Sequence, residues 1–188
     1  MYKNIREEEL KNKVGSDWFS QFDTTEILGN IDFTVFPKQD NLFGRPTLLW
    51  AEAKTGDFDV VTMFVQLILT IGKARTFDKT LPPAFLGAFD FKKIAFVPYI
   101  NIQDVFYLND FNWNVAPSNH ETKEFNLKQK ELWKQTAVNE RKLTDLVAKR
   151  DYTILKKLKE SKSLTRNLAE AVVSASVRPA LGAATGYA

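Results

Sequence analysis

An apolar run that ends in two opposite charges, LLWAEAK at residues 48–54, constrains the fold of this chain more than any other segment. Its length and composition favour a β-strand inside a sheet. Because alternate side chains of a strand share one face, Glu52 and Lys54 are expected to point the same way. Buried charges cost free energy unless they are paired or bind a metal ion, so this pair requires an explanation.

The spacing Glu-x-Lys is informative only in its context. The chain contains it five times, beginning at Glu9, Glu52, Glu121, Glu140 and Glu160. Four of these copies lie in charged stretches that are typical of solvated helices or loops. Only the copy at Glu52 follows an apolar run, so only this copy points to a site.

The composition excludes several classes of protein. The chain has 188 residues, 44% of them hydrophobic, which suits one domain of ordinary size with room for a helical appendage. The absence of cysteine excludes disulfides, thiolate zinc sites and a cysteine nucleophile. The single histidine, His120, lies in an expected loop and leaves little room for histidine-based metal or nuclease chemistry.

The charge pattern indicates where the chain is located and what it could contact. The N-terminal segment MYKNIREEELKNK is too charged for a signal peptide, and no apolar run approaches the roughly 20 residues of a membrane span. We therefore expect a cytoplasmic protein with no membrane partner. Residues 121–170 hold thirteen Lys or Arg against eight Asp or Glu, which fits either a phosphate-contacting surface or a solvated helix face.

The pattern of apolar residues predicts a helix and two strands in the first part of the chain. The helix covers residues 2–14, and the segment 23–28 is a strand or the approach to one. A strand over GNIDFTVFP (29–37) is stopped by Pro37. A loop follows at 38–46, before the strand that contains LLWAEAK.

A second helix is expected from about residue 60 to residue 77, capped by Asp57 or Asp59. Two more strands are predicted over KKIAFVPYI and DVFYLND, the second near an edge of the sheet. This order predicts an α/β (α+β) fold with a mixed sheet covered by helices.

The sequence pattern changes after Pro117, where apolar residues recur at helical spacing among charged residues. We expect a core domain at residues 1–118 and a helical extension or connector at 119–188, with its last amphipathic stretch at about 164–177. The final segment ALGAATGYA does not resemble the natural end of a domain, so the sequence is expected to be an excised part of a longer protein.

A second acidic residue belongs to the same predicted sheet. Asp32 lies in the strand at 29–37, among apolar residues. Two carboxylates on strands that meet at one point are the hard oxygen ligands that Mg²⁺ takes. Such an ion neutralises charge on a phosphate and lowers the pKa of a bound water, which Lys54 could orient. The alternative is a turn acid at Asp32 and a surface ion pair between Glu52 and Lys54.

The segments IDF and WAEAK resemble the signature of the PD-(D/E)xK nuclease superfamily, with Ile31 in place of the proline of its first motif. The resemblance implies that Asp32, Glu52 and Lys54 are catalytic and that the two carboxylates bind the metal ion. The set stands in the order and spacing that the family requires.

The resemblance implies two further site residues. Many such nucleases carry a catalytic glutamine on the next helix, and Gln66 in MFVQLILTIGKA stands at a suitable distance, with Thr70 in place of the aromatic residue that often follows. Some families add a glutamate from the first helix. Glu9 falls on the apolar side of that helix and is our candidate for a further metal ligand, in preference to Glu7 and Glu8.

The order of elements in residues 1–115 is similar to the N-terminal endonuclease domain of type IIG restriction–modification enzymes, in which a helical connector leads to an adenine methyltransferase. The resemblance implies a restriction-endonuclease-like core sheet and a Mg²⁺-dependent endonuclease of double-stranded DNA, with Mn²⁺ able to substitute. Methyltransferase and target-recognition domains would lie in the same or a partner chain, because this sequence has no Gly-rich S-adenosylmethionine loop, no Asn/Asp-Pro-Pro-Tyr motif and no recognisable base-reading element.

Two other functions are compatible with the same residues. A DNA repair or junction-resolving nuclease would use the same centre in a complete small protein. A non-catalytic module with a nuclease-like fold would bind DNA or protein through the basic segment 121–170, and its carboxylates would be incidental. Other catalytic classes have no support, because the chain lacks a P-loop, a G-x-G-x-x-G loop and a G-x-S-x-G elbow.

Overall fold

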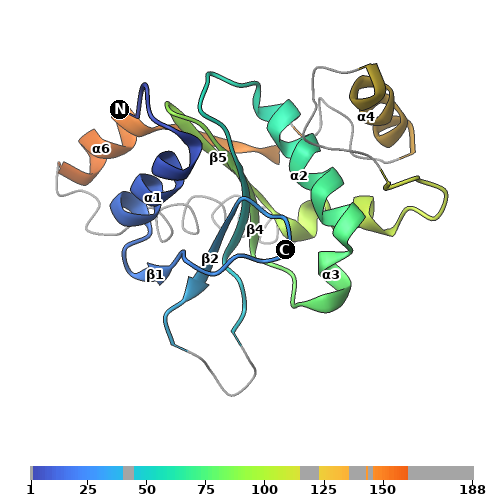
Figure 1. Cartoon of the computed structure of the whole chain (residues 1–188), viewed down its shortest axis with the longest axis horizontal. Helices are drawn as coiled ribbons and strands as arrows, with labels where there is room; N and C mark the ends of the chain where they lie inside the picture. The colour runs from blue at the N-terminus through green and yellow to red at the C-terminus, as the bar shows by residue number, and fades with distance from the viewer. Residues whose placement is uncertain (1, 40–44, 115–122, 136–142, 144–145, 161–188) are drawn as a thin grey trace, which may run out of the picture.

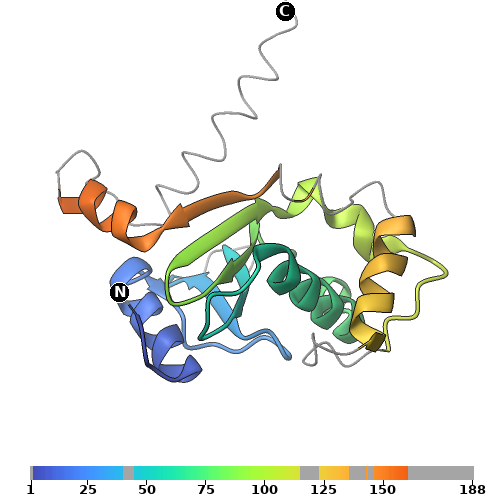
Figure 2. The same ribbon diagram turned by 90° about the horizontal axis from the view of Figure 1, so that it is seen from above.

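The computed structural model describes residues 2–39, 45–114, 123–135, 143 and 146–160. Within them a six-stranded mixed sheet runs in the order β1-β2-β3-β4-β5-β6, with helices on both of its faces (Figures 1 and 2). The predicted α+β class with a helix-covered mixed sheet is confirmed.

The elements follow one another along the chain with these bounds: α1 (Glu7–Trp18), β1 (Phe22–Asp23), β2 (Phe33–Pro37), β3 (Leu49–Ala53), α2 (Val60–Ala74), α3 (Thr76–Lys79), β4 (Phe85–Phe89), β5 (Lys93–Pro98), the 3-10 helices η1 (Tyr99–Asn101) and η2 (Gln103–Tyr107), α4 (Lys123–Gln135), β6 (Ala148–Asp151) and α6 (Tyr152–Glu160). Strands β3 and β4 are parallel and are joined through α2, whereas all other neighbouring strands are antiparallel.

Strand β3 is covered on both faces of the sheet, which explains its continuous apolar sequence. Trp50 packs in the core on the side of α2, and Ala51 and Ala53 pack in the core on the side of α1 and α6. All five residues of the strand are buried. Because side chains alternate, Glu52 lies on the same face as Trp50, toward α2.

Helix α2 begins where its cap was predicted. The side chain of Asp59 accepts a hydrogen bond from the backbone N–H of Thr62 at 2.8 Å, so Asp59 and not Asp57 is the N-cap. The helix ends at Ala74, because Arg75 adopts a left-handed conformation with φ +48°. The prediction that one helix continues to residue 77 is therefore wrong, and the short α3 follows instead.

The first helix begins later than its sequence pattern predicts. Asn4 has φ +59° and Arg6 is extended, so the helix begins at Glu7 and continues to Trp18 instead of covering residues 2–14. A left-handed residue breaks the i to i−4 hydrogen-bond series, which apolar spacing alone does not reveal. In the segment 23–28, only Asp23 belongs to a strand.

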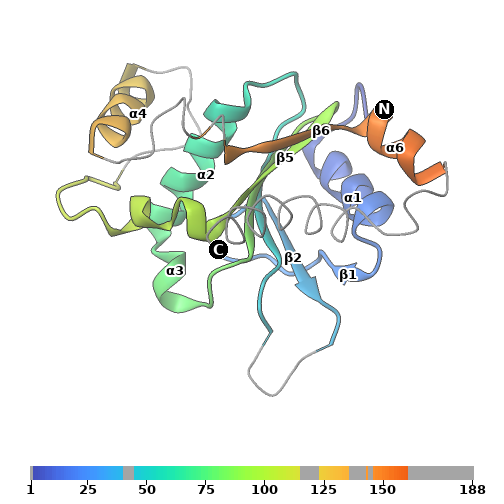
Figure 3. The same ribbon diagram turned by 180° about the vertical axis from the view of Figure 1, so that it is seen from behind.

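Three further elements differ from the prediction. Strand β4 was not predicted, because its sequence FLGAF contains Gly and Ala, which have low strand propensity. The segment DVFYLND is not a strand and forms η2, whose Val105 and Phe106 are buried. Strand β6, with the polar sequence AKRD, pairs with β5 inside the segment that was predicted to be wholly helical (Figure 3).

The remainder of the predicted extension is described only in part. Helix α4 agrees with the helical spacing predicted there, and α6 packs beside α1, with the rings of Tyr152 and Trp18 stacked 5.8 Å apart. The predicted helix at 164–177 and the residue His120 lie outside the described residues. The proposed boundary at residue 118 stays a prediction. No described helix has both the length and the apolar character that a bilayer crossing requires.

The turn between β4 and β5 is held by a fully buried carboxylate. Asp90 accepts hydrogen bonds from the backbone N–H groups of Lys92 at 2.8 Å, Lys93 at 2.9 Å and Phe58 at 3.2 Å. Its second oxygen also contacts the ammonium of Lys93. Since Phe58 precedes α2, this one side chain joins the β4–β5 turn to the segment that leads from β3 into α2.

We predict that Asp90→Ala lowers the free energy of unfolding by about 3 kcal/mol or more, because it leaves the buried ammonium of Lys93 and three backbone donors poorly paired. Urea denaturation followed by circular dichroism measures the change. The exposed Asp110→Ala variant is the control and should change stability by less than about 0.5 kcal/mol. Equal stability of the two variants would contradict the structural role of Asp90.

Candidate active site

The register of β2 and β3 brings the two predicted carboxylates together. Phe33 pairs with Ala51, and one more step along the same antiparallel register sets Asp32 opposite Glu52. Asp32 lies one residue before β2, and not within a strand as predicted. Glu52 belongs to β3, and Lys54 immediately follows that strand.

The side chains of these three residues, which we call the Asp32–Glu52–Lys54 cluster, converge at the end of β3. The ammonium Nζ of Lys54 lies 2.5 Å from Oε1 of Glu52 and 3.8 Å from Oδ2 of Asp32. The backbone N–H of Ala53 donates a hydrogen bond to Oδ2 of Asp32 at 3.3 Å. Neighbouring strand ends therefore hold both carboxylates around one ammonium group.

Burial gives this cluster unusual electrostatics. Only 7% of Glu52 is exposed, and burial together with the charge of Asp32 raises the pKa of Glu52 to about 7, against the opposing effect of Lys54. For Lys54, burial lowers the pKa, but the charge and hydrogen bond of Glu52 and the charge of Asp32 outweigh burial and raise it overall. Lys54 is therefore a cation near neutral pH, and Glu52 is close to its midpoint of titration.

The first helix presents Glu7, and not Glu9, to the Asp32–Glu52–Lys54 cluster. Glu9 is exposed and forms an ion pair with Lys13 at 2.9 Å. Glu7 is half-buried, and burial and the charge of Asp32 raise its pKa while Lys54 acts in the opposite direction.

The helical spacing contains a signal that favours Glu7. Leu10 and Val14, two of the four buried residues of the helix, lie three and seven positions after Glu7, so all three share one face. The sequence-based choice of Glu9 rested on its position on the same side of the expected helix as Ile5, which lies before the observed helix begins. Once the helix begins at Glu7, the spacing places Glu7 at the edge of the buried face.

Gln66, the predicted helical partner of the site, lies in the middle of α2 and is only 1% exposed. Helix α2 packs on the face of the sheet that carries Trp50, which is also the face of Glu52. Gln66 therefore lies in the helical layer on the same side of the sheet as Glu52. Its role in catalysis stays a prediction.

The described residues contain no group of three or more His, Cys, Asp or Glu side chains that could hold a metal ion. A metal ion at the cluster would therefore have two carboxylate ligands, from Asp32 and Glu52. These two groups fit such an ion chemically, because both are hard oxygen donors, and burial and the charge of Asp32 make the ionised form of Glu52 costly without a cation.

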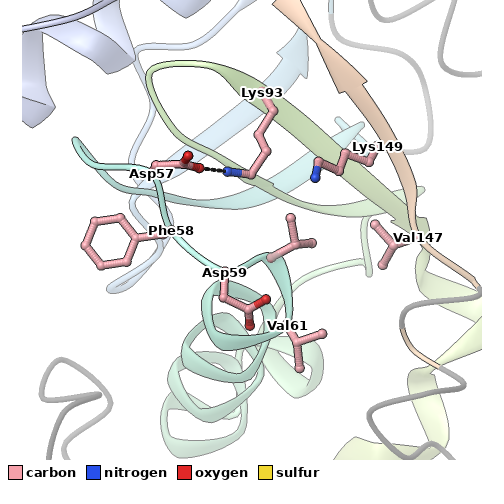
Figure 4. Close-up of a pocket in the computed structure, with 8 residues that line it drawn as sticks. Asp57, Phe58, Asp59, Val61, Lys93, Val147 and Lys149 are labelled. Carbon is pink, nitrogen blue, oxygen red and sulfur yellow. Dashed lines mark hydrogen bonds and ion pairs between the residues drawn. The ribbon is translucent and has the colours of Figure 1, made fainter.

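A second group of charges surrounds a pocket of about 380 Å³ at the N-terminus of α2 (Figure 4). The pocket is lined by Asp57, Phe58, Asp59, Val60, Val61, Lys93, Val147 and Lys149. Lys93 and Asp59 hold the fold together. The Nζ of Lys93 contacts Asp57 Oδ1 at 2.6 Å and also contacts Asp90, which holds the β4–β5 turn. Asp59 caps α2. None of the three cluster residues lines this pocket, and we assign its charges to stability.

Comparison of the chain with protein-family models, with curated proteins and with solved structures found no match. The assignment of a function therefore depends on the chemistry of the site itself.

We predict that the metal-free protein loses stability through Glu52 as the pH rises. The folded protein binds this proton more tightly than the unfolded chain, whose glutamates have a pKa near 4.5, so the contribution is complete below pH 4.5 and is lost as the pH passes about 7. Urea unfolding with EDTA at pH 5 and pH 8 should show this decline in the wild type, and Glu52→Gln should lack it, a difference of about 1–3 kcal/mol.

The exposed Glu9→Gln variant serves as the control and should follow the wild type at both pH values. If the stability of Glu52→Gln and that of the wild type have the same pH dependence, the pKa of Glu52 is not raised to about 7.

Proposed function

We propose that this chain is a Mg²⁺-dependent endodeoxyribonuclease of the restriction–modification type, which hydrolyses phosphodiester bonds of double-stranded DNA. The observation that carries the proposal is the convergence of Asp32, Glu52 and Lys54 at adjacent strand ends. The proposal is also supported by the observed order of α1, β2, β3, α2 and two further strands, which is the order on which the type IIG resemblance was based. Of the two further strands, β5 lies in the expected segment KKIAFVPYI, whereas β4 was not expected and DVFYLND forms no strand.

Asp32 and Glu52 would hold the metal ion, which supplies charge neutralisation of the phosphate and a bound water of lowered pKa. Glu52 must lose its proton to act as a ligand, and its pKa of about 7 places this change in the physiological range. The second oxygen donor, Asp32, is oriented by the backbone N–H of Ala53. Both carboxylates are thus fixed by the sheet.

Burial lowers the pKa of Lys54, but the charges of Glu52 and Asp32 outweigh burial and raise it, so Lys54 is a cation in the metal-free protein. We assign Lys54 to stabilising negative charge on the phosphate and orienting the attacking water. In hydrolysis the water oxygen forms a new bond to phosphorus, one ester P–O bond breaks, and the leaving oxygen takes up a proton. If a cation were held by Glu52 and Asp32, the ammonium of Lys54 would be free of these partners and could contact the phosphate.

The restriction–modification setting is also part of the proposal. Methyltransferase and target-recognition domains would be supplied in the same or a partner chain, as in the type IIG class, and the location would be cytoplasmic. Phosphate contacts position a protein without distinguishing sequences, so the isolated chain should cut DNA slowly and without sequence preference.

Nicking of supercoiled plasmid tests this function. We expect slow nicking by the wild type with Mg²⁺ or Mn²⁺, none with EDTA, and loss of nicking in Asp32→Ala. Lys54→Met should lower the rate about 100-fold or more, the usual effect of removing a group that stabilises developing charge. The Lys54→Met variant should still bind metal, because Lys54 is not a ligand and would compete with the metal ion for the same carboxylates.

Two exposed variants, Asp110→Ala and Lys73→Met, are matched controls and should nick like the wild type. Nicking that survives in Asp32→Ala would contradict the site. DNA binding without metal-dependent nicking would favour a non-catalytic binding module. Sharp fragments with a common flanking sequence would show that this chain reads DNA itself.

A further inference from the structure

The connection between β3 and α2 begins with Lys54 and covers only residues 54–58, ahead of the cap of the helix. Its first residue is held by the sheet, because the backbone N–H of Lys54 donates a hydrogen bond to the carbonyl oxygen of Phe89 at 3.0 Å. Its last residue is held by the following side chain, because the N–H of Phe58 donates to Oδ2 of Asp90 at 3.2 Å. The end of β4 therefore fixes both ends of the segment that carries Lys54.

An ion pair ties the same connection to β5. Nζ of Lys93 lies 2.6 Å from Oδ1 of Asp57, and the dashed line in Figure 4 marks this contact. The side chain of Lys93 is only 6% exposed and also contacts Asp90, whereas the side chain of Asp57 is 60% exposed. The hydrogen bond and charge of Lys93 lower the pKa of Asp57, so this carboxylate is ionised at neutral pH.

Asp57 and Asp90 hold different parts of the molecule. Asp90 is fully buried and binds the backbone of the β4–β5 turn, so the fold depends on it. Asp57 lies at the surface, and its removal leaves the contact between Asp90 and Lys93 in place. Because exposed ion pairs contribute little to global stability, the contact of Asp57 is suited to restricting one local segment.

Lys54 depends on the backbone of this connection more than the two carboxylates of the cluster do. Its ammonium is carried by a flexible four-carbon stem and lies 2.5 Å from Glu52 and 3.8 Å from Asp32. Glu52 belongs to β3, and the register of β2 and β3 places Asp32 opposite it. A looser connection would therefore displace the lysine and leave both carboxylates in place.

On the basis of the proposed function, we propose that Asp57 is a positioning residue for hydrolysis. Its ion pair with Lys93 fixes the connection and so keeps the ammonium of Lys54 at the two carboxylates. Asp57 acts through the backbone and touches neither the metal ligands nor the reacting atoms. Its loss should lower the rate of hydrolysis and leave the affinities for metal and DNA unchanged.

Amide hydrogen exchange of the full chain, measured by NMR without metal, tests the positioning independently of cleavage. In Asp57→Asn the amides of Lys54 and Phe58 should exchange about tenfold faster than in the wild type, because local opening of the connection becomes easier. The matched control is Asp78→Asn, which removes the same charge from an exposed ion pair with Arg75 at 2.5 Å. Both amides should exchange in this control as in the wild type.

Nicking of supercoiled plasmid by excess protein with Mg²⁺ measures the effect on the reaction. Asp57→Asn should nick about tenfold more slowly, the order of effect expected when a group at the reaction centre is misplaced. Its affinity for Mn²⁺ by calorimetry, its affinity for plasmid DNA and its stability in urea should match those of Asp78→Asn.

Equal amide exchange or equal nicking rates in the two variants would overturn the inference. Weaker Mn²⁺ binding in Asp57→Asn would overturn it by assigning the ion pair to the metal site, and lower stability in urea would do so by assigning the pair to the fold as a whole. If the wild type does not nick DNA, the proposed nuclease fails. The exchange rates then decide by themselves whether Asp57 holds the connection that carries Lys54.

Discussion

The antiparallel register between β2 and β3 is the constraint on which the candidate site depends. It sets Asp32, the residue before β2, opposite Glu52, so that two carboxylates meet at one end of these two neighbouring strands. A slip of one residue would turn Asp32 to the other face. The core prevents such a slip, because Phe33 and Val35 must remain with Leu49 and Ala51 under α1. Packing on the opposite face of the sheet from Glu52 therefore fixes the geometry of the site.

Burial of β3 on both faces gives the charges at its end their properties. A strand end between two helical layers has little water, so burial raises the pKa of Glu52 to about 7, and the ammonium of Lys54 contacts this carboxyl group. In the metal-free protein the lysine satisfies the same carboxylates that a divalent ion would bind. The ammonium of Lys54 thus pairs with these carboxylates in the metal-free protein, and a divalent ion could take its place.

The parts of the fold that local sequence determines were predictable, and the parts that depend on distant partners were not. Strand β3 and the Asp59 cap of α2 follow from an apolar run and a capping residue. Strand β6 is polar and becomes a strand through hydrogen bonds to β5, about fifty residues earlier, which a local pattern does not contain. Gly87 weakens the β4 signal, yet a Cβ atom there would lie 2.8 Å from Leu49 Cδ1, so any larger residue would force Leu49 on β3 to shift.

The candidate site was also predictable only in part. Spacing along two neighbouring segments brought Asp32, Glu52 and Lys54 together correctly. Glu9 was chosen in place of Glu7 because Ile5 was counted as part of the first helix, which begins only at Glu7. The central claim is that a divalent ion binds between Asp32 and Glu52. Paramagnetic broadening of amide NMR signals by substoichiometric Mn²⁺ tests it most directly. The account predicts that the signals of Asp32, Ala53 and Lys54 disappear first. Broadening that begins at Asp57 and Asp59 or at exposed carboxylates such as Glu9, while those three signals persist, would contradict it.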